Sequence, residues 1–249
     1  LRLLGLSPSE PSELLSLLEQ THNLDYRQWA ATENKAIDLA RILGTPDDEP
    51  FRRIFARVLD GGNYEAARQH AQARRHSHKP WVVLVSGTNG IRKTTSIHQP
   101  WFKQCLAEAL GHDASDADAL PDGANSFFRQ LDFMMACLGL DEFRNLYSID
   151  ERAPYSEAKA DIFGRYRTLA EMLGCILVRD AQAKRMNLMV ETSGRDIGMY
   201  RYVDHFFPDD AYEKLALHFT INELSFAEAS VDARMEREIR DGCAALAAL

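Results

Sequence analysis

The alternation of apolar and polar residues predicts a helical region followed by an α/β region. Amphipathic segments over 9–20, 26–43, 49–59 and 64–75 indicate helices. Short apolar runs then predict strands over 81–85, 187–192 and 214–221, with helices over 94–110, 125–138, 141–147, 155–184 and 225–246 between and after them. We therefore expect a helical N-terminal region, 1–80, before a domain over 81–249 with a mainly parallel sheet and flanking helices. Residues 112–123 show no strand pattern, so a second strand is missing there.

The first predicted strand runs directly into a glycine-containing segment, Gly87-Thr-Asn-Gly-Ile-Arg-Lys-Thr94. This order is typical of a phosphate-binding loop, in which main-chain N–H groups and a helix N-terminus surround phosphate oxygens. Lys93 would reach the outer phosphates and Thr94 would ligate Mg²⁺. The predicted loop comprises Gly87, Thr88, Asn89, Gly90, Ile91, Arg92, Lys93, Thr94 and Thr95. An ordinary turn between a strand and a helix is the alternative.

Arg92 stands where the loop pattern G-x-x-x-x-G-K-[ST] has its second glycine. A helical φ at this position would tolerate the side chain, whereas a positive φ would not. The backbone conformation at Arg92 therefore decides whether the loop can form with this side chain.

Other polar residues follow the predicted strands or lie on the predicted helices. Glu191 ends the second strand, at the sheet edge where ligands bind, and would approach the Mg²⁺ site. Arg129 and Asp132 lie three residues apart and would share one face of a helix. They would act as a substrate-orienting arginine and a general base, or they form a local pair on the surface. Arg234 and Arg237 would clamp phosphates or belong to a salt-bridged surface helix. The basic segment 73–80 favours a solvated linker over an anion contact.

Composition narrows the function classes. The net charge of −8 argues against bulk nucleic-acid binding. The four cysteines are widely spaced, without a zinc or disulfide pattern, so an intracellular, reducing compartment is expected, the cytoplasm first. No apolar run is long enough for a membrane span. Because the chain begins with leucine, we interpret it as a fragment or processed product, and targeting to an organelle stays open.

The motif order resembles the zeta-toxin type of P-loop small-molecule kinase, within the P-loop NTPase superfamily. The resemblance covers about 81–242 and rests on GTNGIRKT, NLMVETSGRD and KLALHFTINELSFAEASVDARMEREI. It implies a kinase that transfers the γ-phosphoryl group of ATP, with Mg²⁺, to a small-molecule acceptor. Lys93 and Thr94 would take nucleotide and metal, Asp132 would be the base, and Arg234 or Arg237 would clamp the phosphates. The sequence departs from the family at Arg92 and at the missing second strand, where the family's catalytic Asp normally sits.

A second resemblance keeps another class open. The segments NGIRKTTSI and ETSGRD are similar to the signal-recognition-particle type of GTPase, which also has a helical bundle before its nucleotide domain. That family recognises the guanine base through an [ST]KxD motif, and the corresponding segment of this chain is TINEL. Phosphoryl transfer is therefore the first hypothesis, GTP hydrolysis the second, and a nucleotide-binding protein without catalysis the third. The acceptor and the oligomeric state do not follow from the sequence.

Overall fold

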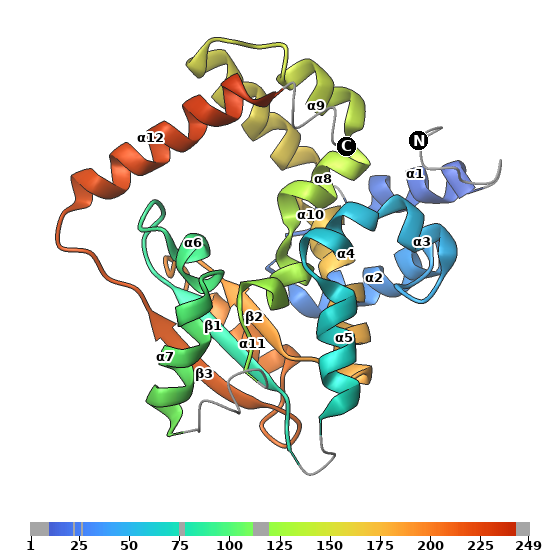
Figure 1. Ribbon diagram of the computed structural model, residues 1–249. Coiled ribbons are helices and arrows are strands. Elements are labelled where there is room, and N and C mark those ends of the chain that lie inside the picture. The colour runs from blue at the N-terminus through green and yellow to red at the C-terminus, as the bar shows by residue number, and fades with distance from the viewer. Residues whose placement is uncertain (1–9, 22, 26, 75–77, 112–119, 243–249) are drawn as a thin grey trace. The chain divides into compact units, whose positions relative to one another are not determined.

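The computed structural model describes residues 10–21, 23–25, 27–74, 78–111 and 120–242 (Figure 1). The chain forms two compact units, each built from separate stretches of sequence. Among the described residues, the helical unit is drawn from 10–58, 130–180 and 232–242, and the sheet unit from 59–129 and 181–231. The units do not follow a division at residue 80, because 59–80 belongs with the sheet.

Three parallel strands form the sheet of the sheet unit. They are β1 (Trp81–Ser86), β2 (Leu188–Glu191) and β3 (Glu213–His218). Their order is β2-β1-β3, so β1 is central and pairs with both others (Figure 1). The predicted α/β class and the parallel sheet are thereby confirmed, and all three strands lie where the apolar runs predicted them.

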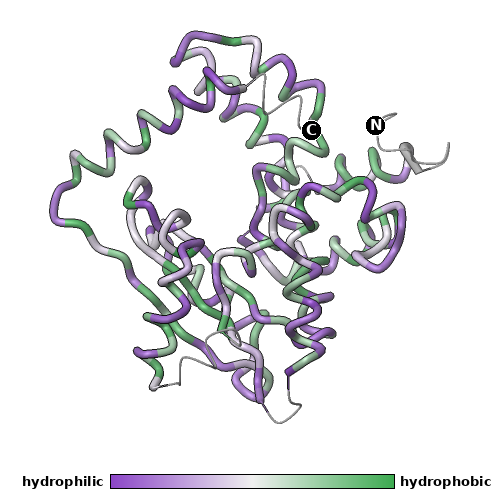
Figure 2. Tube along the Cα trace, viewed as in Figure 1, coloured by the Kyte–Doolittle hydropathy of each residue, from purple (hydrophilic) through white to green (hydrophobic). Residues whose placement is uncertain are grey.

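The central strand is buried almost completely, and Figure 2 shows it as a hydrophobic stretch. Val83 and Val85 pack with Met189 of β2 and with Phe102 and Leu106 in one apolar core. Successive side chains of a strand point to opposite faces, so Val82 and Leu84 face the other side of the sheet and are also buried. A strand that is apolar on both faces belongs in the middle of a covered parallel sheet.

Among the described residues, the sheet unit also contains five helices that precede or follow its strands along the chain. They are α5 (Tyr64–Ala73), α6 (Lys93–Ile97), α7 (Pro100–Leu110), the 3-10 helix η3 (Gly123–Arg129) and α11 (Gly198–Phe206). The single helix expected over 94–110 is divided into α6 and α7. Gln99, which precedes Pro100, is extended (φ −79°, ψ 145°), because the proline ring disfavours a helical residue before it. Pro100 then begins α7, where its missing N–H costs nothing.

The start of the sheet is held by one buried amide, Asn187, which is 5% exposed. Its Oδ1 accepts hydrogen bonds from the Trp81 main-chain N–H (3.0 Å) and from Arg74 Nη2 (2.6 Å). Arg74 Nη1 also donates to the Arg185 carbonyl at 2.5 Å. Arg74, from the basic segment expected to be a solvated linker, therefore joins α5 to β1 and β2. Residues 75–77 of that segment lie outside the described residues.

The helical unit contains most of the remaining helices. They are α1 (Glu10–Thr21), α2 (Trp29–Leu43), α3 (Glu49–Ile54), α8 (Leu131–Leu138) and α9 (Leu140–Leu146). Three further helices contribute residues to both units: α4 (Ala56–Gly61), α10 (Arg152–Ala183) and α12 (Leu224–Arg240). In α10 the predicted apolar stripe is confirmed, since Ile162, Leu169 and Leu173 are buried. None of the helices in the described part of the chain combines the length and apolar character needed to cross a bilayer.

Candidate functional site

The loop after β1 is held by three residues with positive φ: Gly87 (141°), Gly90 (88°) and Arg92 (64°). Arg92 does not have the helical φ that would tolerate its side chain without strain, because it adopts the left-handed conformation (ψ 30°) that turns the chain into α6. A non-glycine residue there carries strain of about 1–2 kcal/mol. The guanidinium of Arg92 stacks over the Phe226 ring, 5.4 Å from its centroid. The loop therefore keeps the conformation that a second glycine would favour, with an arginine in its place.

Lys93 is the first residue of α6 and its side chain folds back over the loop. The residue is 8% exposed. Its Nζ donates to the Gly87 carbonyl at 2.7 Å and to the Thr88 carbonyl at 3.0 Å. A buried ammonium that lies against neutral carbonyl oxygens is placed to gain from an anion.

Thr94 and Glu191 meet at the carboxyl end of the sheet. Glu191 pairs in register with Val85 of β1, so the end of β2 lies beside the start of the loop. Thr94 Oγ1 donates to Glu191 Oε2 at 2.7 Å. Hydroxyl and carboxylate oxygens are ligands that Mg²⁺ prefers, and such sites are usually completed by phosphate and water. Among the described residues there is no group of three or more His, Cys, Asp or Glu side chains that would hold a metal without such help.

The remaining loop residues are mostly open to solvent. Thr88, Asn89, Arg92, Thr94 and Thr95 are exposed, whereas Gly90 and Ile91 are partly buried and Gly87 is buried.

The first turns of α12 pack directly on the loop. A Cβ added to Gly90 would lie 2.1 Å from the Ala227 carbonyl oxygen and 3.0 Å from Val231 Cγ2. Real Cβ atoms do not approach other atoms so closely, so only glycine fits at this position. The sequence placed later arginines of this helix, Arg234 and Arg237, near the phosphates, but the packing of Ala227 and Val231 on Gly90 was not predicted.

Sequence reasoning also missed His218, which lies at the same edge of the sheet. It ends β3 in register with Ser86, and Ser86 Oγ and His218 Nδ1 are 2.9 Å apart. Gly194, in the turn after β2, has φ 72°, and a Cβ added there would lie 3.5 Å from the Gly87 nitrogen. A polar residue ending a parallel strand is the sequence signal that would have found His218.

The other predicted catalytic residues belong to the helical unit. Arg234 and Arg237 are exposed on α12. The neighbouring Glu238 forms an ion pair with Lys159 of α10. Asp132 lies in the first turn of α8 and lines a cavity of the helical unit. The structure thus groups Lys93, Thr94 and Glu191 in one unit and Asp132, Arg234 and Arg237 in the other.

The expected pairing of Arg129 with Asp132 fails for a local reason. The helix expected over 125–138 is two elements, since η3 ends at Arg129 and α8 begins at Leu131. A spacing of three residues places side chains on one face only within a continuous α-helix. Arg129 instead stacks over the Tyr202 ring, with its guanidinium 5.7 Å from the centroid.

The chain was compared with protein-family models, with curated proteins and with solved structures, and none of the three comparisons gave a match. The function is therefore argued from the geometry of Lys93, Thr94 and Glu191.

Proposed function

We propose that this chain binds ATP with Mg²⁺ through the loop 87–95 and transfers the γ-phosphoryl group to a small-molecule acceptor. The observation that carries the proposal is the hydrogen bond between Thr94 and Glu191, which joins two sequence motifs 97 residues apart. Each motif was assigned to the nucleotide site separately, from its own residues. Their contact at the carboxyl edge of a parallel sheet is the arrangement that nucleotide binding needs.

The residues present fit a magnesium nucleotide. Lys93 is buried beside the loop carbonyls and would contact the outer phosphates. Thr94 and Glu191 would hold the metal, directly or through water. The added side chain of Arg92 is accommodated over Phe226. Once bound, the magnesium nucleotide would supply the transferable phosphoryl group and neutralise part of its charge.

The roles of Asp132, Arg234 and Arg237 rest on the resemblance to zeta-toxin-like kinases. Asp132 would take the proton of the acceptor hydroxyl, and the arginines would stabilise charge on the transferred group. Both roles require the helical unit to meet the nucleotide during the reaction.

Calorimetric titration with ATP and Mg²⁺ tests the nucleotide site. Lys93→Ala should weaken binding at least about tenfold, which corresponds to about 1.4 kcal/mol. Glu191→Gln should remove most of the dependence on Mg²⁺ while ATP binding without metal changes little. Lys103→Ala is the matched control, because this lysine of α7 pairs with Asp122 at 3.0 Å and lies outside the loop. Unchanged binding in Lys93→Ala would remove the proposal.

A GTPase is the second candidate, favoured by the close approach of Gly194 to the start of the loop. A segment after the second strand that lies against the loop is placed to sense the terminal phosphate. Titration with GTP in place of ATP separates the two candidates. Tighter binding of GTP, with release of inorganic phosphate and no transfer to an acceptor, would favour the GTPase.

A further inference from the structure

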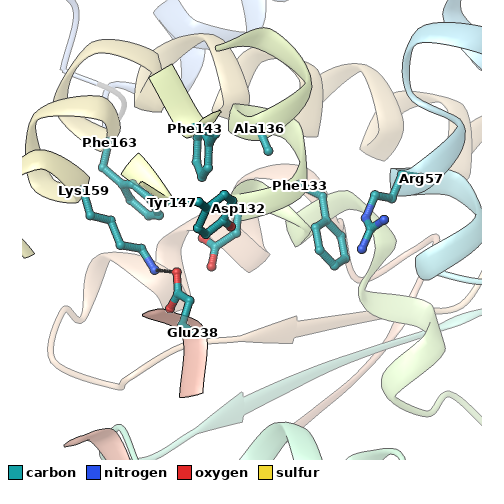
Figure 3. A pocket seen from close by; sticks show the side chains of 9 residues that line it. All are labelled: Arg57, Asp132, Phe133, Ala136, Phe143, Tyr147, Lys159, Phe163 and Glu238. Carbon is teal, nitrogen blue, oxygen red and sulfur yellow. Dashed lines mark hydrogen bonds and ion pairs between the residues drawn. The ribbon is translucent and has the colours of Figure 1, made fainter. Parts of the chain in front are cut away.

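The helical unit contains a cavity of about 200 Å³, and of the residues given roles in the proposed function only Asp132 lines it. Aromatic side chains from α8, α9 and α10 line it, with charged side chains at its rim (Figure 3). The aromatic residues are Phe133, Phe143, Tyr147 and Phe163. Its volume is below the about 300 Å³ at the lower end of ordinary ligand pockets, so it suits a ligand of about one ring.

One carboxylate of the cavity already holds a cation against an aromatic ring. Glu238 accepts a hydrogen bond from the Tyr155 hydroxyl at 2.8 Å and pairs with the Lys159 ammonium, as Figure 3 shows for the lysine. The same ammonium lies 5.5 Å from the centroid of the Phe163 ring. Ammonium, carboxylate and ring face together form a stable arrangement for a positive charge.

The other carboxylate, Asp132, lies in the same aromatic cavity but forms no ion pair among the described residues, although Lys159 is near enough to lower its pKa. Within the described residues it makes no hydrogen bond and no ion pair. The second cation of the cavity, Arg57, stacks over Phe133 at 5.0 Å. Burial raises the pKa of Asp132 and Glu238 adds to this, while Lys159, Arg234 and Arg167 lower it. Asp132 is itself exposed, so its carboxyl group stands at the open side of the aromatic cavity, without a hydrogen bond or ion pair among the described residues.

We propose that this cavity binds a small organic cation, a primary or quaternary amine on an apolar body of about one ring. The ammonium lies against Asp132 and the body packs among Phe133, Phe143 and Tyr147. The ligand would thus give Asp132 a cation that also lies against an aromatic ring, as Lys159 beside Phe163 does for Glu238. A neutral ligand would leave Asp132 without a counter-charge. An anion would be repelled by Asp132, while Lys159 is already paired with Glu238 and Arg57 is stacked over Phe133. This site is independent of the proposed nucleotide loop.

Calorimetry with four matched probes tests the charge preference. Benzyltrimethylammonium and benzylamine are the cations, benzyl alcohol is the neutral probe and benzoate is the anion. The cations should bind the full chain at least about tenfold more tightly than the other two, as about 1.4 kcal/mol of charge recognition gives. Equal or tighter binding of the alcohol or the benzoate overturns the proposal, and so does the absence of binding by all four.

Variants then locate the binding. Asp132→Asn keeps the shape and removes the charge, so it should reduce the affinity for benzyltrimethylammonium about tenfold or more. Asp141→Asn is the control, because this exposed acid of α9 pairs with Arg144 at 3.3 Å and does not line the cavity. Phe133→Leu keeps the Asp132 carboxyl group but removes an aromatic ring, so it should weaken the binding of benzyltrimethylammonium severalfold. Unchanged affinity in Asp132→Asn overturns the assignment.

The pH dependence gives a readout that a structural role would not produce. Benzyltrimethylammonium does not titrate, so its affinity should fall as the pH drops through the pKa of Asp132, which is raised above 3.8. Asp132→Asn should abolish most of this dependence. Lys93→Ala should leave amine binding unchanged, which separates this site from the nucleotide loop. If Asp132 acted only as a base, Asp132→Asn would stop transfer without changing the affinity for the amine.

Discussion

At the scale of single residues, Gly90 shows how closely the loop and α12 approach each other. Gly90→Ala would press a methyl group into the Ala227 carbonyl, 2.1 Å away, so α12 or the loop must move. We expect the free energy of unfolding to fall by about 2–4 kcal/mol, from about 1–3 kcal/mol of overpacking and about 1 kcal/mol of backbone strain at φ 88°. Gly111→Ala is the control: φ there is 69°, but no atom lies within 4 Å, so only about 1 kcal/mol of backbone strain is expected. If urea unfolding gave the same loss of stability for Gly90→Ala and Gly111→Ala, the close approach of Gly90 to the Ala227 carbonyl would be contradicted.

Arg92 allows a direct test of the left-handed conformation. Arg92→Gly and Arg92→Ala both remove the stacking on Phe226. They differ in that alanine must keep φ near 64° at a cost, whereas glycine adopts it freely. Arg92→Gly should therefore be more stable than Arg92→Ala by about 1 kcal/mol in urea unfolding. An alanine variant as stable as the glycine variant would mean that the positive φ is not maintained in solution.

Asp132 should make stability depend on pH in a defined direction. Its pKa in the folded protein is raised, so the folded state binds the proton more tightly than the unfolded state does. The ionised group consequently destabilises the fold at neutral pH, and Asp132→Asn should raise the melting temperature at pH 7. This gain should disappear as the pH falls below the ordinary value of 3.8, where the carboxyl group is protonated in both states. A loss of stability at pH 7 would show that the charge is compensated.

At the scale of elements, the sheet depends on Asn187 as well as on its apolar strands. Asn187→Ala would leave the Trp81 N–H and the Arg74 guanidinium without this acceptor. Removing a buried acceptor from two donors should lower the free energy of unfolding by about 2–3 kcal/mol. Asn145→Ala, at an exposed position of α9, should change it by less than about 0.5 kcal/mol. A similar small change in both variants would show that the amide is not needed.

The helices and strands that follow from a clear local pattern of apolar residues could be predicted from the sequence. Those whose position depends on contacts distant in the sequence could not. The strand β1 follows from an uninterrupted apolar run before a glycine, and the stripe of α10 from its spacing. The helix α11 was not predicted, and the break between Arg129 and Leu131 interrupts a segment with a continuous helical pattern. Thr94 and Glu191 were assigned correctly to one edge because parallel strands share that edge. Asp132 belongs to the helical unit and Lys93, Thr94 and Glu191 to the sheet unit, a division set by long-range packing that residue spacing does not encode.

At the scale of the whole molecule, neither unit is a continuous piece of sequence. A chain that ends at Asp180 would contain β1 but neither of its strand partners, β2 and β3. We expect the amides of 82–86 to exchange with deuterium at the rate of an unfolded chain in this truncation, and to be protected in the full chain. Protected amides in the truncated chain would mean that β1 has a partner elsewhere.

The same layout has a consequence during protein synthesis. Trp81 and Asn187 are 106 residues apart, so β1 leaves the ribosome well before any strand that pairs with it exists. At about 5–20 residues per second, the delay is about 5–20 s. Through this interval the most apolar segment of the sheet has both of its hydrogen-bonding edges open. Neighbouring nascent chains on one polysome therefore compete with β2 for β1, and slower translation lengthens that competition.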